Sequence, residues 1–281
     1  MSTLSRTLSL IDLFSTDRLF WTVEDLGEAT GYNRATVYRY VRDLVSFGFL
    51  VRTGDGHYSL GPRIVELDHL IRRSDPFLIA GQPVAEDLAN LTSADINLCA
   101  LFGEQIVTVL QHGGAGGGLP LTFGRGRRLP LLRGAGSKII VANFTPTQIA
   151  RVFAAEGPEA VARLGCAPEL PAFRALLARW RKAGFAESEG ELDPGYAAAA
   201  VPVFTPDGRI LGSIAAAMTR ERFDLVRTER MVDVLVRGAE RITSGLLAVG
   251  WPVSAGNKAA QTAPEPPGAN DGPSGRIGTH G

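Results

Sequence analysis

The chain has 281 residues, 45% of them apolar, and its 29 basic side chains are balanced by 29 acidic ones. That length and apolar content can supply two domains with separate hydrophobic cores, and the zero net charge argues against indiscriminate binding of polyanions. The apolar stretches are too short to cross a bilayer and the N-terminus does not resemble a signal peptide. We therefore expect a soluble, cytoplasmic protein with no membrane partner.

Metal-binding and disulfide-forming residues are sparse. The two cysteines, Cys99 and Cys166, form no CxxC pair, and the four histidines are scattered along the sequence. This pattern predicts neither a disulfide framework nor a zinc site. We expect no metal and no cofactor, and we interpret both thiols as packing residues.

An N-terminal helix is predicted over the sequence SRTLSLIDLFS. Leu8, Ile11, Leu13 and Phe14 give it an apolar side that is broad enough to contact both its own domain and a partner chain.

A second helix should begin at Thr22, whose hydroxyl can cap the helix while Asp25 reaches back in a capping box. This helix is expected to carry Leu26 and Ala29 inward. Gly31 can adopt the left-handed conformation that ends a helix and turns the chain sharply.

The following helix combines an apolar stripe with a polar face. Asn33 is a good N-cap, and Val37, Val41 and Leu44 recur at helical spacing on one side. At about 100° per residue, the opposite side carries small, hydroxyl and guanidinium groups suited to bases and phosphates. The residues of the two helices that we expect at a DNA interface are Thr22, Asn33, Arg34, Ala35, Thr36, Tyr38, Arg39 and Arg42.

Two short β segments, 49–52 and 57–60, surround a glycine-containing turn and predict the wing of a winged helix, with Arg52 and His57 placed to reach phosphates. From Asn33 to Arg52 four arginines oppose one aspartate, a local charge of +3. A few arginines on an isolated helix would indicate only a solvated surface. The helix-turn-helix spacing and the wing favour DNA binding instead.

The rest of the sequence predicts a linker helix and a second, mixed domain. Pro76 should end the linker helix and start another helix that carries Leu78, Val84, Leu88 and Leu91. The further predicted elements are a hairpin over 96–111, helical structure over 147–184, a hairpin over 196–217 and one long terminal helix over 219–249. The expected divisions are a DNA-binding domain over 1–61, a linker helix over 62–75, an α+β domain over 76–250 and a disordered tail over 251–281.

Two glycine-containing segments are candidates for ligand binding. Residues 113–118, GGAGGG, lack the GK[ST] that a phosphate-binding loop requires, so we interpret them as a flexible connection. Residues 129–138 are expected to form a loop whose small residues lead into the apolar helix 139–142. Backbone N–H groups at such a helix start favour an anion.

The order of these motifs resembles the IclR family of bacterial transcriptional regulators, over about residues 4 to 249. Pro130, Leu131 and Lys138 match a PLHxxxxGK signature of the family, and the wing ends in a matching YSLG. Residues 184–208 match the later signatures GYAxDxEExxxG and APVFDxxG in part. The resemblance implies an N-terminal winged helix-turn-helix domain, a linker helix and a C-terminal GAF-like α/β effector-binding domain.

The resemblance also implies an effector site, in which backbone groups at Ala135 and Gly136 help to hold a small organic acid. Where members that bind small polar acids have Asp, Cys and two Ser, this chain has Ser188 and three alanines. Such a pocket leaves the oxygens of a small polar acid unpaired, at about 1 to 3 kcal/mol each, and therefore favours an acid with an aromatic or apolar body. The expected effector-binding residues are Leu121, Ala135, Gly136, Ser137, Ser188, Tyr196, Ala198, Ala215 and Ala217.

We therefore expect double-stranded DNA with a pseudo-palindromic operator as one partner, a small organic acid as another, and a homodimer or homotetramer as the assembly. Repression of a catabolic operon is what the resemblance implies, with activation as the alternative. A closed pocket without an effector and a winged helix that binds protein are also compatible with the sequence.

An enzyme is disfavoured, and no catalytic residues are proposed. The sequence has no GxSxG elbow, no supported Ser-x-x-Lys motif and no metal-ligand spacing. We interpret the acidic cluster 187–193 as a solvated turn.

Overall fold

A computed structural model describes residues 2–114, 124–226 and 228–251. The chain divides into two compact units, with the boundary between Arg72 and Arg73. The predictions for the GGAGGG segment, for Leu121 and for residues 252–281 fall wholly or partly outside the described residues.

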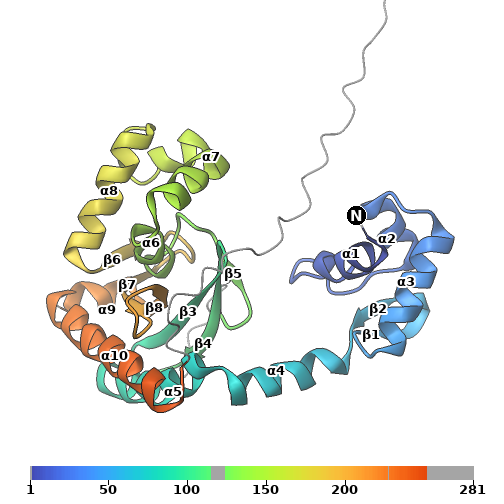
Figure 1. The fold of residues 1–281 in the computed structure, drawn as a ribbon, viewed down its shortest axis with the longest axis horizontal. Coiled ribbons are helices and arrows are strands. Elements are labelled where there is room, and N and C mark those ends of the chain that lie inside the picture. The colour runs from blue at the N-terminus through green and yellow to red at the C-terminus, as the bar shows by residue number, and fades with distance from the viewer. Residues whose placement is uncertain (1, 115–123, 227, 252–281) are drawn as a thin grey trace, which may run out of the picture. The chain divides into compact units, whose positions relative to one another are not determined.

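The first unit is a winged helix-turn-helix (Figure 1). Its elements are α1 (Thr3–Ser9), α2 (Val23–Thr30), α3 (Arg34–Ser46), β1 (Leu50–Arg52) and β2 (Tyr58–Leu60), followed by α4 (Pro62–Ser74), which crosses the boundary. The two strands pair antiparallel, and Trp21 joins them through a bridge to Tyr58. The wing predicted from the sequence is confirmed, with each strand one residue shorter than expected.

One hydrophobic core holds this unit together. It is formed by buried residues of α2, α3, β1 and the segments before them: Leu10, Trp21, Val23, Leu26, Val37, Tyr40, Val41, Leu44 and Leu50. Two expectations about the N-terminal helices were wrong. Ala29 is exposed and Val23 is buried in its place, and the first helix ends at Ser9, after which residues 11–13 form a separate 3-10 turn.

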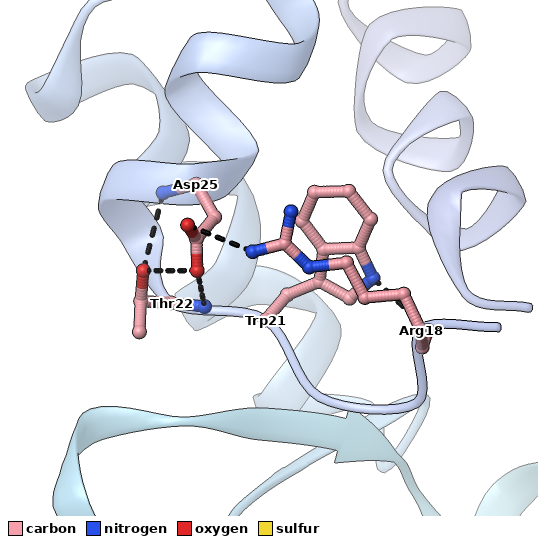
Figure 2. A network of polar contacts seen from close by, with 4 residues as sticks. All are labelled: Arg18, Trp21, Thr22 and Asp25. Atoms are coloured by element: carbon pink, nitrogen blue, oxygen red, sulfur yellow. Dashed lines mark hydrogen bonds and ion pairs between the residues drawn. The ribbon is translucent and has the colours of Figure 1, made fainter.

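A network of polar contacts fixes the start of α2 (Figure 2). The Thr22 hydroxyl accepts from the Asp25 backbone N–H at 3.1 Å, and the Asp25 carboxylate accepts from the Thr22 backbone N–H at 3.1 Å, which completes the predicted capping box. The guanidinium of Arg18 pairs with Asp25 at 2.7 Å and lies 3.8 Å from the centre of the Trp21 ring. At the other end, Gly31 ends the helix with φ of 71°.

The second unit is a six-stranded antiparallel sheet with helices on both faces (Figure 1). Its strands, in the spatial order β5-β4-β3-β8-β7-β6, are β3 (Asp95–Phe102), β4 (Gln105–His112), β5 (Arg128–Leu129), β6 (Ala186–Glu189), β7 (Tyr196–Phe204) and β8 (Ile210–Thr219). Its helices are α5 (Pro76–Thr92), α6 (Ala135–Ala142), α7 (Pro146–Ala162), α8 (Leu170–Ala183), α9 (Arg220–Leu225) and α10 (Thr228–Ala248).

Alternation along the strands separates two cores. On one face, Ala199, Val201 and Ile214 pack in a core with α5 and α10. On the other face, Ala200 and Ala215 pack in a core with α6, α7 and α8. The two-residue period of a strand is what sends neighbouring residues to opposite helical layers.

Several helix boundaries and buried positions predicted from the sequence for this unit were wrong. The predicted terminal helix is two helices, because the chain becomes extended at Val226, and Leu225 is exposed. Leu91 is also exposed, and Trp251, assigned to the tail, packs partly buried against the core on the α5 and α10 face. Helix α6 begins at Ala135, four residues before the predicted start.

Among the described residues, no helix combines the length and apolar character needed to cross a bilayer. The same residues contain no group of three or more His, Cys, Asp or Glu side chains that could hold a metal ion.

The capping network makes the titration of Asp25 a direct test of this geometry. The hydrogen bond from Thr22 and then the contact with Arg18 lower the pKa of Asp25 from 3.8 to about 2. A lowered pKa means that this carboxylate stabilises the fold above about pH 3.8, and that its contribution is lost as the pH falls through about 2. Carbon-13 NMR of the carboxyl group should give a midpoint near 2 in the wild type.

In Thr22→Ala the midpoint should move towards 3.8, since the largest cause of the lowered pKa is removed. A wild-type midpoint at the ordinary value of an exposed aspartate would contradict the network.

Candidate DNA-binding face and effector pocket

Helix α3 has one buried and one exposed side. Val37, Tyr40, Val41 and Leu44 are at most 4% exposed, so the predicted stripe is confirmed with Tyr40 added. The ring of Tyr40 packs edge-on against Tyr32 at 6.1 Å between ring centres. Aliphatic spacing alone did not predict this aromatic pair.

The opposite side of α3 carries the residues predicted to meet DNA. Arg34, Ala35, Tyr38, Arg39 and Arg42 are exposed, and Thr36 is half-buried. Their spacing on a helix that is anchored by its other side leaves this surface accessible within the first unit.

The arginines of this face differ in their partners. Arg34 pairs with Glu24 at 2.9 Å and Arg42 approaches Asp43 at 3.7 Å, both as exposed pairs of small energetic weight. The guanidinium of Arg39 lies 5.4 Å from the centre of the Tyr40 ring, and no acidic partner within ion-pair distance is found for it among the described residues. Arg39 is therefore the guanidinium of this face that an anionic partner can engage without displacing a carboxylate.

The two cap residues have structural partners already. The Thr22 hydroxyl donates to the Asp25 carboxylate at 2.7 Å, and the Asn33 side-chain oxygen accepts from the Thr36 N–H at 2.9 Å. In the wing, Arg52 is exposed on β1 and His57 is half-buried after the turn, where Asp55 has a φ of 59°. The caps orient the ends of α2 and α3, whereas Arg52 can extend to a neighbouring anion.

In the second unit, a pocket lies between α6 and the sheet. Its volume is about 80 Å³, which is room for about three water molecules at the roughly 30 Å³ that each takes in the liquid. Ala198, Ala215 and Ala217 form part of its floor, on β7 and β8, and Ser188 and Tyr196 lie at one side. Ala198 pairs in register with both Ser188 and Ala217, so these positions adjoin one another across three strands.

The N-terminus of α6 forms the other wall. Ala135, Gly136 and Ser137 all line the pocket, and the Ser137 hydroxyl is buried without a hydrogen-bond partner in the described structure. A side chain at Gly136 would place its Cβ 3.1 Å from both Cys99 Sγ and Ser213 Oγ, a tight contact that glycine avoids where the helix approaches the sheet. The first-turn N–H groups of a helix are donors for an anion.

Glu191 is a pocket residue whose role no local sequence pattern revealed. Its carboxylate accepts from the Gly134 N–H at 2.8 Å and pairs with the ammonium of Lys138, whose side chain is only 7% exposed. Its backbone carbonyl accepts from Arg133. The interpretation of 187–193 as a solvated turn was therefore wrong for Glu191, because contacts with residues more than fifty positions away draw it inward.

This pair sets the electrostatics of the α6 N-terminus. Glu191 uses the Gly134 N–H and neutralises Lys138, which also lies 5.4 Å from the centre of the Trp180 ring. A ligand anion is left with the N–H groups of Ala135 to Ser137 and the Ser137 hydroxyl. Neutral donors of this kind bind one carboxylate without requiring a further cation.

Cys99 lies in the pocket wall as a neutral thiol. Burial raises its pKa to about 11, against the opposing effect of the neighbouring Ser213 and Thr108 side chains. A thiol with this pKa is protonated at neutral pH and is a poor nucleophile. The interpretation of Cys99 as a packing residue agrees with this environment.

Eight of the nine predicted effector residues line this pocket, and Leu121 lies outside the described residues. Several other lining residues were not predicted from the sequence, among them Asn97, Thr108, Leu129, Glu191, Leu192 and Asp193. Asn97 carried a usable signal, since it is a lone amide in the otherwise apolar run Ile96-Asn97-Leu98-Cys99. For Glu191 the available signal was its place within residues 184–208, which match the later family signatures in part.

A winged helix-turn-helix followed by an α/β unit is the architecture of a DNA-binding transcriptional regulator. Family models assign both parts: the IclR helix-turn-helix domain matches residues 3–54, and the C-terminal domain of bacterial IclR transcriptional regulators matches residues 73–244. The chain belongs to the IclR family of DNA-binding transcriptional regulators.

Individual relatives agree with this assignment. The Pca regulon regulatory protein of Pseudomonas putida is 25% identical over 216 residues, which is 76% of this chain and 73% of that protein. An IclR-type regulator structure from Silicibacter sp. TM1040 is 27% identical and aligns with a TM-score of 0.72 over 87% of this chain and 96% of its own. An IclR homologue from Microbacterium hydrocarbonoxydans, solved with 4-hydroxybenzoate, has the same fold at 22% identity and a TM-score of 0.72, over 88% and 100% of the two chains.

The pairing of Lys138 with Glu191 should be a stability determinant of the second unit. Lys138→Met leaves the largely buried Glu191 carboxylate unpaired and should cost about 2 kcal/mol in the free energy of unfolding, less than the roughly 3–5 kcal/mol for fully buried pairs. The double variant Lys138→Met/Glu191→Leu should recover part of that loss. Urea unfolding followed by circular dichroism measures both.

The matched control is Arg151→Met, which breaks an exposed pair with Glu104 at 3.0 Å and should change stability by less than about 1 kcal/mol. Equal effects of Lys138→Met and Arg151→Met would show that the pair does not stabilise the unit.

Proposed function

We propose that the protein represses a catabolic operon and that a small organic acid with an aromatic or apolar body controls it. The observation that supports this most is the pocket itself, which combines the donors of the α6 N-terminus with a floor of alanines. Activation of the same kind of operon is the alternative, since the sign of regulation depends on which conformation the effector stabilises. The protein would act in the cytoplasm, on double-stranded DNA.

The DNA partner that we propose is a pseudo-palindromic operator. One α3 helix presents few base-contacting side chains, so strong specificity requires two heads on two half-sites. Arg39 and the neighbouring exposed residues would enter the major groove, and Arg34, Arg42 and Arg52 would contact phosphates. His57 would add a contact from the wing.

A homodimer would supply the second head, and two dimers would give a homotetramer. Exposed apolar side chains support such an assembly, namely Leu4 and Leu8 on α1 and Val65, Leu70 and Ile71 on α4. Exposed large apolar side chains on a helix without a buried residue, as α4 is, are typical of association surfaces.

For the effector, the carboxylate would accept from the N–H groups of Ala135, Gly136 and Ser137 and from the Ser137 hydroxyl. The body would lie against Tyr196 and the pocket alanines, with Ser188 at the edge. The IclR homologue solved with 4-hydroxybenzoate, an aromatic acid, supports this class of ligand. The cavity also supports effector binding over a pocket closed by packing.

Arg39→Ala should weaken binding to an operator selected from a random DNA pool by the full-length protein. The expected loss is about 1–3 kcal/mol, the range for a guanidinium that reads a base, with reduced discrimination at one position of each half-site. Fluorescence anisotropy at fixed salt measures it. Arg151→Ala, which removes an exposed arginine of α7, is the control and should leave the affinity unchanged.

Unchanged affinity for Arg39→Ala, with folding and assembly intact, would show that α3 does not read the operator. Selection of no DNA sequence at all would favour a winged helix that binds protein.

Calorimetry with the full-length protein should show benzoate or phenylacetate binding at least tenfold more tightly than glyoxylate or pyruvate, because the alanine floor matches an apolar body. Ala198→Leu should remove that binding by filling the cavity. Ala154→Leu, at an exposed position of α7, is the matched control. Tighter binding of glyoxylate or pyruvate would contradict the size argument.

A further inference from the structure

Asn97 is a buried amide with an unused hydrogen-bonding atom at the pocket. The residue is 8% exposed, it lines the cavity between α6 and the sheet, and its Oδ1 atom has no hydrogen-bond partner among the described residues. A buried polar atom without a partner is costly, and native structures rarely keep one without a reason.

The neighbours of Asn97 across the sheet do not satisfy it. In register, it lies between Ala215 on β8 and Gln111 on β4. Alanine has no side-chain donor, and the Gln111 amide donates to Asp95 at 3.1 Å. The register therefore leaves the side of Asn97 that faces the pocket available for a ligand.

Asn97 and the α6 N-terminus lie at separate places in the same cavity. The start of α6 sits above Cys99 and Ser213, as the close approach at Gly136 shows. Asn97 precedes Cys99 by two residues on β3 and points to the same face, about 7 Å further along the strand. One group of a bound molecule can contact the helix while another, several bonds away, contacts the amide.

We propose that Asn97 selects effectors that carry a hydroxyl group on the ring, so that the ligand class is a hydroxylated aromatic carboxylic acid. This rests on the proposed function, in which α6 holds the carboxylate. The hydroxyl donates to Asn97 Oδ1, and because a hydroxyl both donates and accepts, it also suits the amide in its reversed orientation. An unsubstituted ring excludes water from Asn97 without replacing its hydrogen bond, so it binds less tightly.

Isothermal titration calorimetry of the full-length protein with benzoate, 3-hydroxybenzoate and 4-hydroxybenzoate tests this selectivity. At least one of the hydroxylated acids should bind about tenfold more tightly than benzoate. Asn97→Leu, an apolar replacement of similar size, should abolish this ratio of the affinity for the hydroxylated acid to the affinity for benzoate. The affinity of the variant for benzoate should stay within about threefold of wild type. Asn90→Leu makes the same exchange at an exposed position of α5 and should keep the wild-type ratio.

The outcomes separate this inference from the function on which it rests. Equal binding of the three acids to the wild type overturns the role of Asn97 and leaves an aromatic-acid effector standing. A ratio that persists in Asn97→Leu also overturns it. Binding of none of the three acids, in a protein that still selects DNA, overturns both. The wild-type ratio decides the question even if Asn97→Leu does not fold.

Discussion

The amphipathic character of α3, with one buried apolar side and one exposed polar side, is the constraint on which the DNA-binding unit depends. Burying Val37, Tyr40, Val41 and Leu44 stabilises the fold by roughly 1.5–3 kcal/mol for each large apolar side chain. Rotating the helix to bury Arg39 instead would remove a charge from water, which costs far more unless a partner is supplied. The apolar stripe therefore fixes which side faces outward, and the caps at Thr22 and Asn33 fix where the helices begin.

The same division between two faces shapes the second unit. On the α5 and α10 side, β7 and β8 add Val201, Val203, Ile214 and Met218 to their alanines, whereas on the α6 side the same strands carry alanines at 198, 200, 215 and 217. Those alanines do not fill the space below the start of α6, and the result is a cavity. Glu191 and Lys138 close the adjoining end as a neutral pair, so the pocket offers hydrogen-bond donors without a free cation beside them.

Features that depend on residues close together in the sequence were predicted correctly. Contacts between residues far apart in the sequence were not predicted. The capping box of Thr22 and Asp25, the turn at Gly31, the wing and both hairpins follow from residues within a few positions of each other, and the family resemblance located about half of the pocket lining. The inward position of Glu191 depends on contacts with Gly134 and Lys138, which no local pattern encodes.

The errors have physical reasons as well. Helical spacing predicted a single helix through Leu225, but spacing does not report the extended backbone at Val226 that divides it. Ala29 and Leu91 fit apolar stripes in the sequence, yet both are exposed, because no element among the described residues covers them. The start of α6 was predicted late because Gly136 in its first turn has a low helix propensity, which packing against the sheet overrides.

The claim that the free side of α3 enters the DNA groove can be tested by photo-crosslinking. A benzoylphenylalanine replacing Tyr38, which is 59% exposed, should crosslink to bases within each half-site of a selected operator. The same probe replacing Phe102, which is 55% exposed in the second unit, should give no crosslink to bases. Base crosslinks from position 102 and none from position 38, with operator affinity retained, would contradict the account.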